Sequence, residues 1–275
     1  MPALALLGIF LVYPILWSLW ISLQVGKGSN LHFGGFANII RLFGDRVFLH
    51  ALTNTCIFFV VQVPIMIVLA LIFAVMLNDS KLWGRGFYRT AIFLPCVTSL
   101  VAYSALFRSM FEADGVVNNA LLALHLIAEP IQWLTDPVWA KVMIILAITW
   151  RWTGYNMIFY LAALQNIDQS IYEAARIDGI PARARFLRLT VPLLKPVILF
   201  TSIISTIGTL QLFDEVNNIT QGGPGDATLT LSLYIYNLTF QFMPSFGYSA
   251  TVSYVIVAMV AVLSFLQFMV AREKS

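Results

Sequence analysis

The sequence predicts an all-α, polytopic membrane protein with six transmembrane helices. Three observations support this class: the 275 residues are 60% hydrophobic and only 11% charged, long uncharged segments recur, and Lys and Arg gather between them. Soluble domains, in contrast, are roughly 45–50% apolar and about 25% charged. The net charge of +3 is small and gives no reason to expect nucleic acid as a partner.

Six segments are long enough and apolar enough to cross a lipid bilayer, which takes about 20 residues of helix. The first has no basic region or A-x-A cleavage site, so we expect a retained span and not a signal peptide. No linker or change of composition divides the chain, which predicts a single transmembrane domain over residues 1–275. The expected spans are approximately 3–24, 51–78, 88–112, 139–164, 192–213 and 249–271.

Charged residues delimit these segments. The first two spans are uncharged, the third lies between Arg89 and Arg108, and the fifth lies between Lys195 and Asp214. The sixth is uncharged up to its C-terminal end, whereas the fourth contains Arg151. We expect no Asp or Glu well inside a span.

The charges of the loops predict the orientation, because Lys and Arg accumulate on the cytoplasmic side of a membrane. If the N-terminus is inside, the inside loops hold ten Lys and Arg residues and the outside loops hold five. We therefore expect both termini and the loop 165–191 in the cytoplasm. The loop 214–248 contains no Lys or Arg and is expected outside.

Residues 168–196 hold five of the sixteen Lys and Arg residues. Ser170 and Glu173 have the spacing of a capping box, which predicts the start of a helix. We expect Gly179 to end that helix with a positive φ, and Pro181 to begin a second helix that continues into the fifth span. The pair could lie on the membrane surface with its arginines at lipid headgroups, or form a knob that docks into a soluble partner. The two alanines after Glu173 favour docking.

The same stretch resembles the cytoplasmic EAA signature of binding-protein-dependent ABC importer permeases, EAA-x3-G-x9-[IL]-x-[LV]-P. Leu189 stands where Ile is common, and Val191 stands where Leu is common. The residues that match the signature at its spacing are Glu173, Ala174, Ala175, Gly179, Leu189, Val191 and Pro192. The resemblance implies that an ATPase subunit contacts Tyr172, Glu173, Ala174, Ala175, Asp178, Gly179, Phe186 and Pro192.

The resemblance covers nearly the whole chain. LVYPILWSLWISL resembles the first span of these permeases, and LFDEVNNITQGGPGDATLTLSLYIY resembles the external loop of the first-permease subtype of maltose, lactose and glycerol-phosphate importers. It implies a type I ABC importer transmembrane domain in the cytoplasmic (inner) membrane of a bacterium. Besides the lipid bilayer, the implied partners are a second permease, two ATP-binding subunits, an external solute-binding protein and a sugar substrate.

We expect the chain to be a transport subunit and not an enzyme. It has no G-x-x-x-x-G-K-[ST] sequence to hold nucleotide phosphates. We therefore expect ATP and Mg²⁺ on the partner ATPase, and no cofactor in this chain. His32, His50 and His125 lack the spacing of metal ligands, and Cys56 and Cys96 are expected to be small apolar residues.

Polar and aromatic residues gather on the fourth and fifth spans, a mixture that suits a neutral carbohydrate. Helix–helix packing is the alternative explanation for the small polar side chains. A charge at mid-span usually faces a cavity or a partner, so Arg151 is expected on the pathway. The predicted pathway residues are Arg151, Trp152, Tyr155, Asn156, Ser205, Thr209, Gln211 and Asp214, and Trp150 and Ser202 belong to the same cluster.

The residues alone leave several functions open. Arg151 could bind a sugar hydroxyl or an anionic group, so the solute could be a neutral sugar, an acidic sugar or a polyol phosphate. A secondary sugar carrier is a rival class, but such carriers commonly have paired repeats and intramembrane acids, which we do not find in the sequence. A membrane enzyme would need a set of catalytic residues, and the sequence suggests none.

Overall fold

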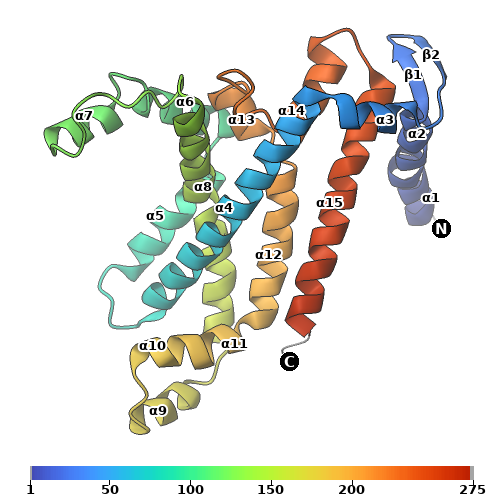
Figure 1. The fold of residues 1–275 in the computed structure, drawn as a ribbon. Coiled ribbons are helices and arrows are strands. Elements are labelled where there is room, and N and C mark those ends of the chain that lie inside the picture. Colours follow the sequence, from blue (N-terminus) through green and yellow to red (C-terminus); the bar gives the residue numbers. More distant parts are fainter. Residues whose placement is uncertain (1, 273–275) are drawn as a thin grey trace.

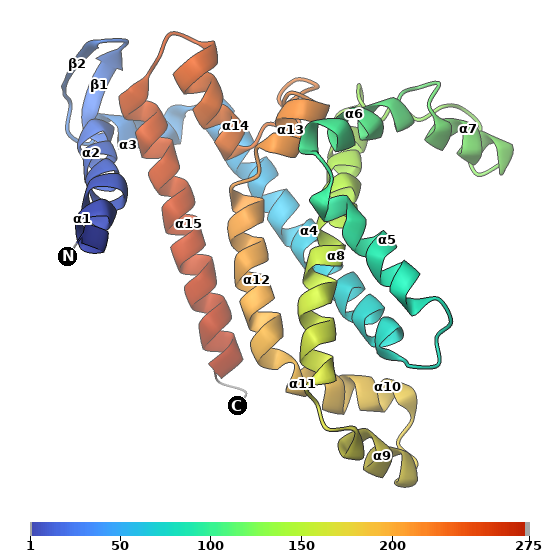
Figure 2. The same ribbon diagram turned by 180° about the vertical axis from the view of Figure 1, so that it is seen from behind.

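The computed structural model describes residues 2–272, which form a tall bundle of helices with one small β-hairpin (Figure 1). The chain begins with one continuous helical run made of α1 (Pro2–Leu7), the π-helical turn η1 (Gly8–Val12) and α2 (Tyr13–Ser22). The longer helices that follow are α4 (Arg46–Asn78), α5 (Arg85–Val97), α8 (Pro137–Gln165), α12 (Lys195–Leu210) and α15 (Phe246–Arg272). They run between the two ends of the molecule in alternating directions (Figures 1 and 2).

The shorter elements gather at these two ends (Figure 2). The hairpin end carries β1 (Gln24–Lys27), β2 (Asn30–Phe33), α3 (Ala37–Gly44), α6 (Leu100–Met110), α7 (Val116–Ala123), α13 (Asp214–Ile219), α14 (Leu231–Tyr236) and η3 (Asn237–Gln241). The opposite end, called the α9 end here, carries α9 (Gln169–Ile177), α10 (Ala182–Arg185), η2 (Phe186–Thr190) and α11 (Val191–Leu193). The last described residues of α15 also lie toward the α9 end.

The all-α class is confirmed apart from the hairpin, whereas the count of six spans is not confirmed exactly as predicted. Three helices are long and apolar enough to cross a membrane by themselves: Pro2–Ser22, α4 and α15. The count rises to five if each of two bent helix pairs is one span. The predicted fourth span corresponds to α8, a helix of 29 residues. It is not among these candidates, and it contains the charged Arg151 and the polar Asn156.

The third and fifth spans are not the straight helices that the apolar pattern predicts. α5 and α6 meet at 102°, with Thr98 in an extended conformation at the break. The run Ala182–Leu193 meets α12 at 72°. Pro196 explains the second break, because a proline has no amide hydrogen for the preceding turn and its ring clashes with the carbonyl four residues back. The fifth span therefore starts at Lys195, and Pro192 belongs to the preceding helix.

The hairpin is the part of the fold that the sequence analysis missed. Its strands pair antiparallel, with Gln24 opposite Phe33 and Lys27 opposite Asn30. Gly26 has a φ of +135°. A side chain there would collide with the carbonyl oxygen of Asn30. Only glycine fits this close approach. A ten-residue hairpin, from Gln24 to Phe33, is too short to stand out within an otherwise helical sequence.

Small residues allow the central helices to approach closely. Ala70 and Ala74 of α4 and Ala140 and Ala147 of α8 are completely buried. A Cβ added at Gly154 of α8 would lie 2.0 Å from the carbonyl oxygen of Ile92, so α5 packs directly on this glycine. Small side chains at helix interfaces are typical of membrane bundles. They fix the middle of α8 between α4 and α5.

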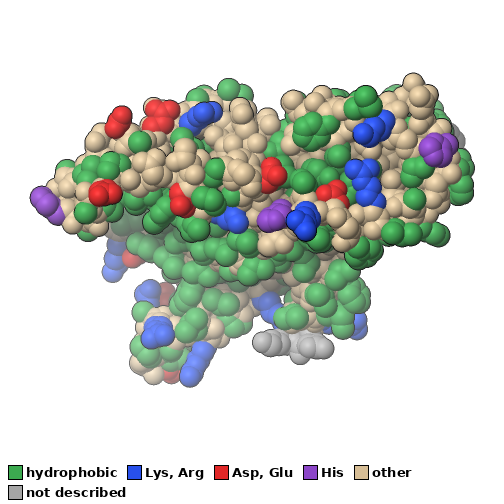
Figure 3. All heavy atoms as spheres, turned by 45° about the horizontal axis from the view of Figure 1, so that its top comes forward, with side chains coloured by type: hydrophobic (Ala, Val, Ile, Leu, Met, Phe, Trp, Pro, Cys, Tyr) green, Lys and Arg blue, Asp and Glu red, His purple; other side chains and the backbone are tan. Residues whose placement is uncertain are grey.

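Charged side chains lie mainly at the two ends of the molecule. Figure 3 shows acidic and basic side chains spread over the hairpin end, above a region dominated by hydrophobic side chains. Further Lys and Arg side chains lie on the α9 end, below that apolar region. This distribution fits a protein whose middle is surrounded by lipid and whose ends face water.

Candidate functional site

One cavity of about 550 Å³ opens between α4, α6, α8, α12 and α13. All eight predicted pathway residues lie on its wall, together with nine residues that the sequence analysis did not single out. The cavity lies within the roughly 300–1,000 Å³ of small-molecule sites. The nine additional residues are Gln62, Met66, Leu100, Ile148, Ile204, Gly208, Leu212, Phe213 and Glu215.

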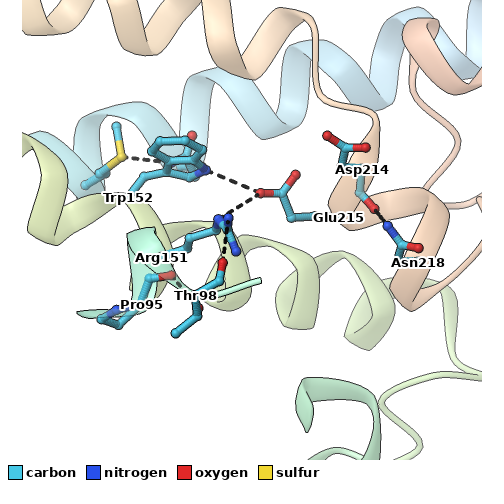
Figure 4. Close-up of polar contacts among 9 residues, drawn as sticks. Pro95, Thr98, Arg151, Trp152, Asp214, Glu215 and Asn218 are labelled. Carbon is cyan, nitrogen blue, oxygen red and sulfur yellow. Dashed lines mark hydrogen bonds and ion pairs between the residues drawn. The ribbon is translucent and has the colours of Figure 1, made fainter. Parts of the chain in front are cut away.

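Arg151 lies on the cavity wall and is only 7% exposed (Figure 4). Its Nε atom is 4.0 Å from Oε1 of Glu215, and its Nη2 atom donates to the carbonyl oxygen of Thr98 over 3.4 Å. The guanidinium carbon is 5.0 Å from the centre of the Tyr103 ring and 5.7 Å from that of Trp152. Arg151 therefore lines the cavity, as expected, and an acidic residue compensates its charge.

Glu215 is the main residue of the cavity that the sequence analysis missed. It follows Asp214 at the start of α13, beyond the end of the fifth span. The sequence analysis therefore placed it at the beginning of the external loop. The chain folds back there and buries Glu215 to 5% exposure. Burial raises the pKa of the Glu215 carboxyl, whereas its own amide, Trp152 and Arg151 oppose that change by favouring the ionised form. In the sequence, the available signal was the mid-span Arg151, because ionisable residues inside spans pair with one another or with backbone carbonyls.

Polar side chains of three helices meet across the cavity. Thr209 of α12 donates to Oε1 of Gln62 on α4 over 2.9 Å. Ser205 of α12 donates to Oδ1 of Asn156 on α8 over 3.4 Å. The Gln62 amide also contacts the sulfur of Met66 at 3.2 Å. An isolated Gln in the apolar second span was the sequence signal for the contribution of α4.

Aromatic rings form another part of the wall. Trp152 is about one-third exposed, and its Nε1 donates to Oε1 of Glu215 over 3.3 Å. The ring of Tyr155 stands edge-on to it, with centroids 5.8 Å apart. Trp150 and Ser202, from the same predicted cluster, do not line the cavity. Trp150 instead stacks on Tyr103 and is half exposed.

The cavity wall therefore combines an indole face, hydroxyl and amide groups, and one charge pair. Each carbohydrate ring presents several hydroxyl groups and less polar C–H faces, and both kinds of surface find complementary groups on this wall. Arg151 is the one cationic side chain among the cavity residues, and Glu215 and Asp214 are the acidic ones. The arrangement can hold a neutral, hydroxyl-rich solute.

The α9 end carries the second group of predicted residues. Asp168 caps α9 by accepting from the Ser170 amide over 2.9 Å, and this bond is the main reason why its pKa is lowered. The predicted capping box of Ser170 and Glu173 was therefore wrong, because Asp168 supplies the cap and the helix begins at Gln169. Pro181 directly precedes α10, as expected.

Gly179 forms the turn between α9 and α10. Its φ is +71°, which confirms the predicted positive value. The Gly179 amide donates to the carbonyl of Arg176, and the Ile180 amide donates to that of Ala175, both over 3.0 Å. This pair of bonds is a Schellman motif, which ends helices at a left-handed glycine.

The remaining predicted contact residues differ in exposure. Ala175 is buried within the chain, so of the two alanines only Ala174 is open to a partner. The Tyr172 hydroxyl is 3.1 Å from that of Thr190, which ties α9 to η2. Tyr172 and Phe186 are half-buried, and the exposed members are Glu173, Ala174, Asp178, Gly179 and Pro192.

Comparison with known proteins agrees with the family resemblance of the sequence. Residues 30–274 match the family described as binding-protein-dependent transport system inner membrane component. The lactose transport system permease protein LacF of Rhizobium radiobacter is 71% identical over 99% of this chain and 92% of that protein. The trehalose/maltose transport system permease protein MalF of Thermococcus litoralis is 34% identical over 96% of this chain and 88% of that protein.

The fold also matches a solved structure. A bacterial ABC transporter involved in the import of the acidic polysaccharide alginate contains a chain that superposes with a TM-score of 0.86 at 24% identity. The match covers 99% of this chain and 93% of that chain. The likeness establishes the shared fold.

Proposed function

Because this chain belongs to the family of inner-membrane components of binding-protein-dependent transport systems, we propose that it forms the solute pathway of an ATP-driven sugar importer. Membership makes it a transport subunit, with ATP hydrolysis on a separate ATPase subunit, and it displaces the alternative of a secondary carrier. The observation that carries the proposal is the cavity, whose wall offers an indole face and hydrogen-bonding side chains in the middle of the bundle.

The proposed substrate is lactose or a related neutral disaccharide. The identity of 71% to LacF supports this choice. Trp152 offers a face for a sugar ring, and Asn156 and Ser205 offer groups for its hydroxyls. An acidic sugar or polyol phosphate is the second candidate, which the charge of Arg151 favours. Glu215 and Asp214 on the same wall oppose it.

The proposed assembly contains a second permease, two ATP-binding subunits and an external binding protein. ATP and Mg²⁺ would bind between the ATP-binding subunits. Their closure would move the coupling helices, a name used here for α9 to α11, and so rock the bundle until the cavity opens outward. Hydrolysis would reset it. Because the Schellman turn and the bond from Tyr172 to Thr190 make this segment rigid, it suits the transmission of force.

We further propose that both termini and the α9 end face the cytoplasm, which the ratio of ten to five Lys and Arg residues supports. Cysteine labelling tests this in a variant without Cys56 and Cys96. A cysteine at Ser29 in the hairpin turn should react with an impermeant reagent from outside. One at Ala182 should react only after the membrane is opened. The reverse pattern would contradict the orientation.

The function itself is tested by reconstitution. The chain is placed in proteoliposomes with its partner permease, ATPase and binding protein from the same organism, and uptake of labelled lactose is measured. We expect uptake that needs both ATP and the binding protein. Uptake that continues without ATP, or a complete system that leaves lactose outside, would contradict the proposal.

A further inference from the structure

We infer that Glu215 sets the charge specificity of the cavity, by compensating Arg151 so that a neutral sugar is accepted and an anionic one is rejected. The inference rests on the proposed function, because it concerns the solute that the same cavity holds. It assigns to Glu215 a role in selection that goes beyond the packing of α13 against α8.

Part of the hydrogen-bonding capacity of the Arg151 guanidinium is left without an acceptor among the described residues. Its Nε and Nη1 atoms are buried and find no hydrogen-bond partner among the described residues. Its third nitrogen, Nη2, donates to the carbonyl oxygen of Thr98, and this hydrogen bond is long at 3.4 Å. A guanidinium offers five N–H donors, and a buried donor without an acceptor is costly. The side chain therefore retains donors for a further acceptor.

The position of Arg151 is fixed from two sides. The rings of Tyr103 and Trp152 flank the guanidinium at 5.0 and 5.7 Å. Tyr103 is buried, and Trp152 is held by its bond to Glu215. These contacts hold Arg151 on the cavity wall when a neighbouring residue is changed, so its donors remain beside the cavity.

Glu215 is the group that offsets this charge. Its Oε1 lies 4.0 Å from Arg151 Nε, and both side chains are more than nine-tenths buried. Two opposite charges at this distance interact several times more strongly at a buried site than in water. Asp214, the preceding residue, also lines the cavity but is exposed, and it forms no salt bridge with Arg151 among the described residues. An anionic solute would therefore meet a compensated arginine beside a second carboxylate.

Replacing Glu215 by Gln tests this with little change in shape. The Gln carbonyl can still accept from Trp152, but the negative charge is lost. The measurement is equilibrium binding of labelled lactose to the purified complex without its binding protein. Unlabelled lactitol and lactobionate compete for the site. Both carry a galactosyl group on an open six-carbon chain, and they differ in a neutral CH₂OH against a carboxylate.

We expect lactitol to displace lactose from the wild-type complex far better than lactobionate does. In Glu215→Gln, the preference should shift toward lactobionate by on the order of tenfold, the scale of one hydrogen bond to a charged group. Asp214→Asn is the matched control, because it removes a neighbouring negative charge from the same wall. We expect it to shift the preference toward lactobionate clearly less than Glu215→Gln does, because Asp214 is exposed and lies farther from the buried charge pair than a direct contact.

Arg151→Gln combined with Glu215→Gln provides the second arm, and it remains informative if Glu215→Gln alone does not assemble. We expect the double variant to bind lactitol and to reject lactobionate as the wild type does. An unchanged preference in Glu215→Gln, or an equal shift in Asp214→Asn, would overturn the inference. A wild-type complex that binds neither lactose nor lactitol would instead overturn the proposed function, before any variant is compared.

Discussion

Trp152 offers its ring to the cavity while one edge of that ring is held in place. The indole is about one-third exposed, and its nitrogen donates to Glu215. Tyr155 supports it edge-on at 5.8 Å. An aromatic ring that is already fixed loses little freedom when a ligand packs against it. Trp152 is therefore the residue that we expect to contribute most to holding a sugar ring.

Replacing Trp152 by Ala should lower lactose uptake about tenfold, because a ring contact is worth about 0.5–1.5 kcal/mol beyond the area it buries. Trp150→Ala is the control. Trp150 is two residues away on the same helix, but it packs on Tyr103 outside the cavity wall. Uptake by reconstituted vesicles measures both. Equal losses in the two variants would show that the effect comes from weakened helix packing and not from the cavity.

The residues of the cavity could be predicted only in part. The cluster on α8 and α12 was visible because polar side chains are rare in apolar segments. Glu215 was not, because its burial depends on the fold of α13 after the end of the fifth span. Gln62 and Met66 come from a helix far away in sequence, and their contact with Thr209 and Asn156 follows from packing alone.

At the scale of secondary-structure elements, helix breaks and helix ends could also be predicted only in part. The apolar pattern of residues 88–112 continues through the 102° bend between α5 and α6, so it cannot reveal the bend. Helix ends with a local chemical signal were easier to predict. Gly179 ends α9 as its left-handed conformation requires. The predicted start of α9 was two residues late, because two possible caps, Asp168 and Ser170, lie close together.

Gly179→Asp should uncouple the ATPase from transport. A side chain at this φ costs about 1 kcal/mol or more, and it would change the angle between α9 and α10 and add a charge there. We expect normal insertion, with weak docking of the ATPase or hydrolysis without transport. Pull-down of the ATPase and lactose uptake from the same vesicles measure the two effects.

Gly225→Asp is the matched control for this prediction. Gly225 also has a positive φ, +53°, and an open surrounding, but it lies in the loop before α14 at the hairpin end. The same strain and charge there should leave ATPase docking intact. Wild-type docking and transport in Gly179→Asp would mean that α9 and α10 lie on the membrane surface and do not couple.

Asp45 joins three helices at the hairpin end. Its Oδ1 atom accepts from the amides of Val47 and Phe48 and so caps α4. Its Oδ2 atom accepts from the hydroxyls of Tyr234 on α14 and Tyr248 on α15, both at 2.6 Å. Burial alone would raise the pKa of the Asp45 carboxyl, but these hydrogen bonds outweigh it and lower the pKa below 3.8.

The direction of that pKa change predicts acid sensitivity. A lowered pKa means that the ionised carboxyl stabilises the fold above its ordinary pKa, and that this contribution is lost as the pH falls through the lowered value. Thermal unfolding in detergent, measured from neutral pH to below pH 3.8, should show the loss. Asp45→Asn should be less stable at neutral pH and less sensitive to acid.

Asp136→Asn controls for the loss of a charged helix cap. Asp136 caps α8 through the amides of Val138 and Trp139, and it accepts no tyrosine hydroxyl among the described residues. This variant should keep the acid sensitivity of the wild type. If Asp45→Asn loses stability in acid as steeply as the wild type, the sensitivity must arise elsewhere.

At the scale of the whole molecule, the cavity and the coupling helices lie at different heights of one bundle. α8 runs from the hairpin end to the α9 end, and α12 returns from the coupling helices toward the hairpin end (Figure 1). Both helices contribute residues to the cavity wall. A movement of the coupling helices would therefore reach Ser205 and Asn156 through two continuous helices. The proposed function depends on this connection, and above all on the cavity being the route that the sugar takes.

Thiol modification of a cavity residue tests that route most directly. Ser205→Cys, in a variant without Cys56 and Cys96, is treated with a bulky thiol reagent, and ATP-dependent lactose uptake is then measured in reconstituted vesicles. Ser202→Cys, on the same helix but outside the cavity wall, is the control. We predict that modification of Ser205→Cys stops uptake, that lactose slows the modification, and that Ser202→Cys keeps most of its uptake. Full uptake after complete modification of Ser205→Cys would contradict the account.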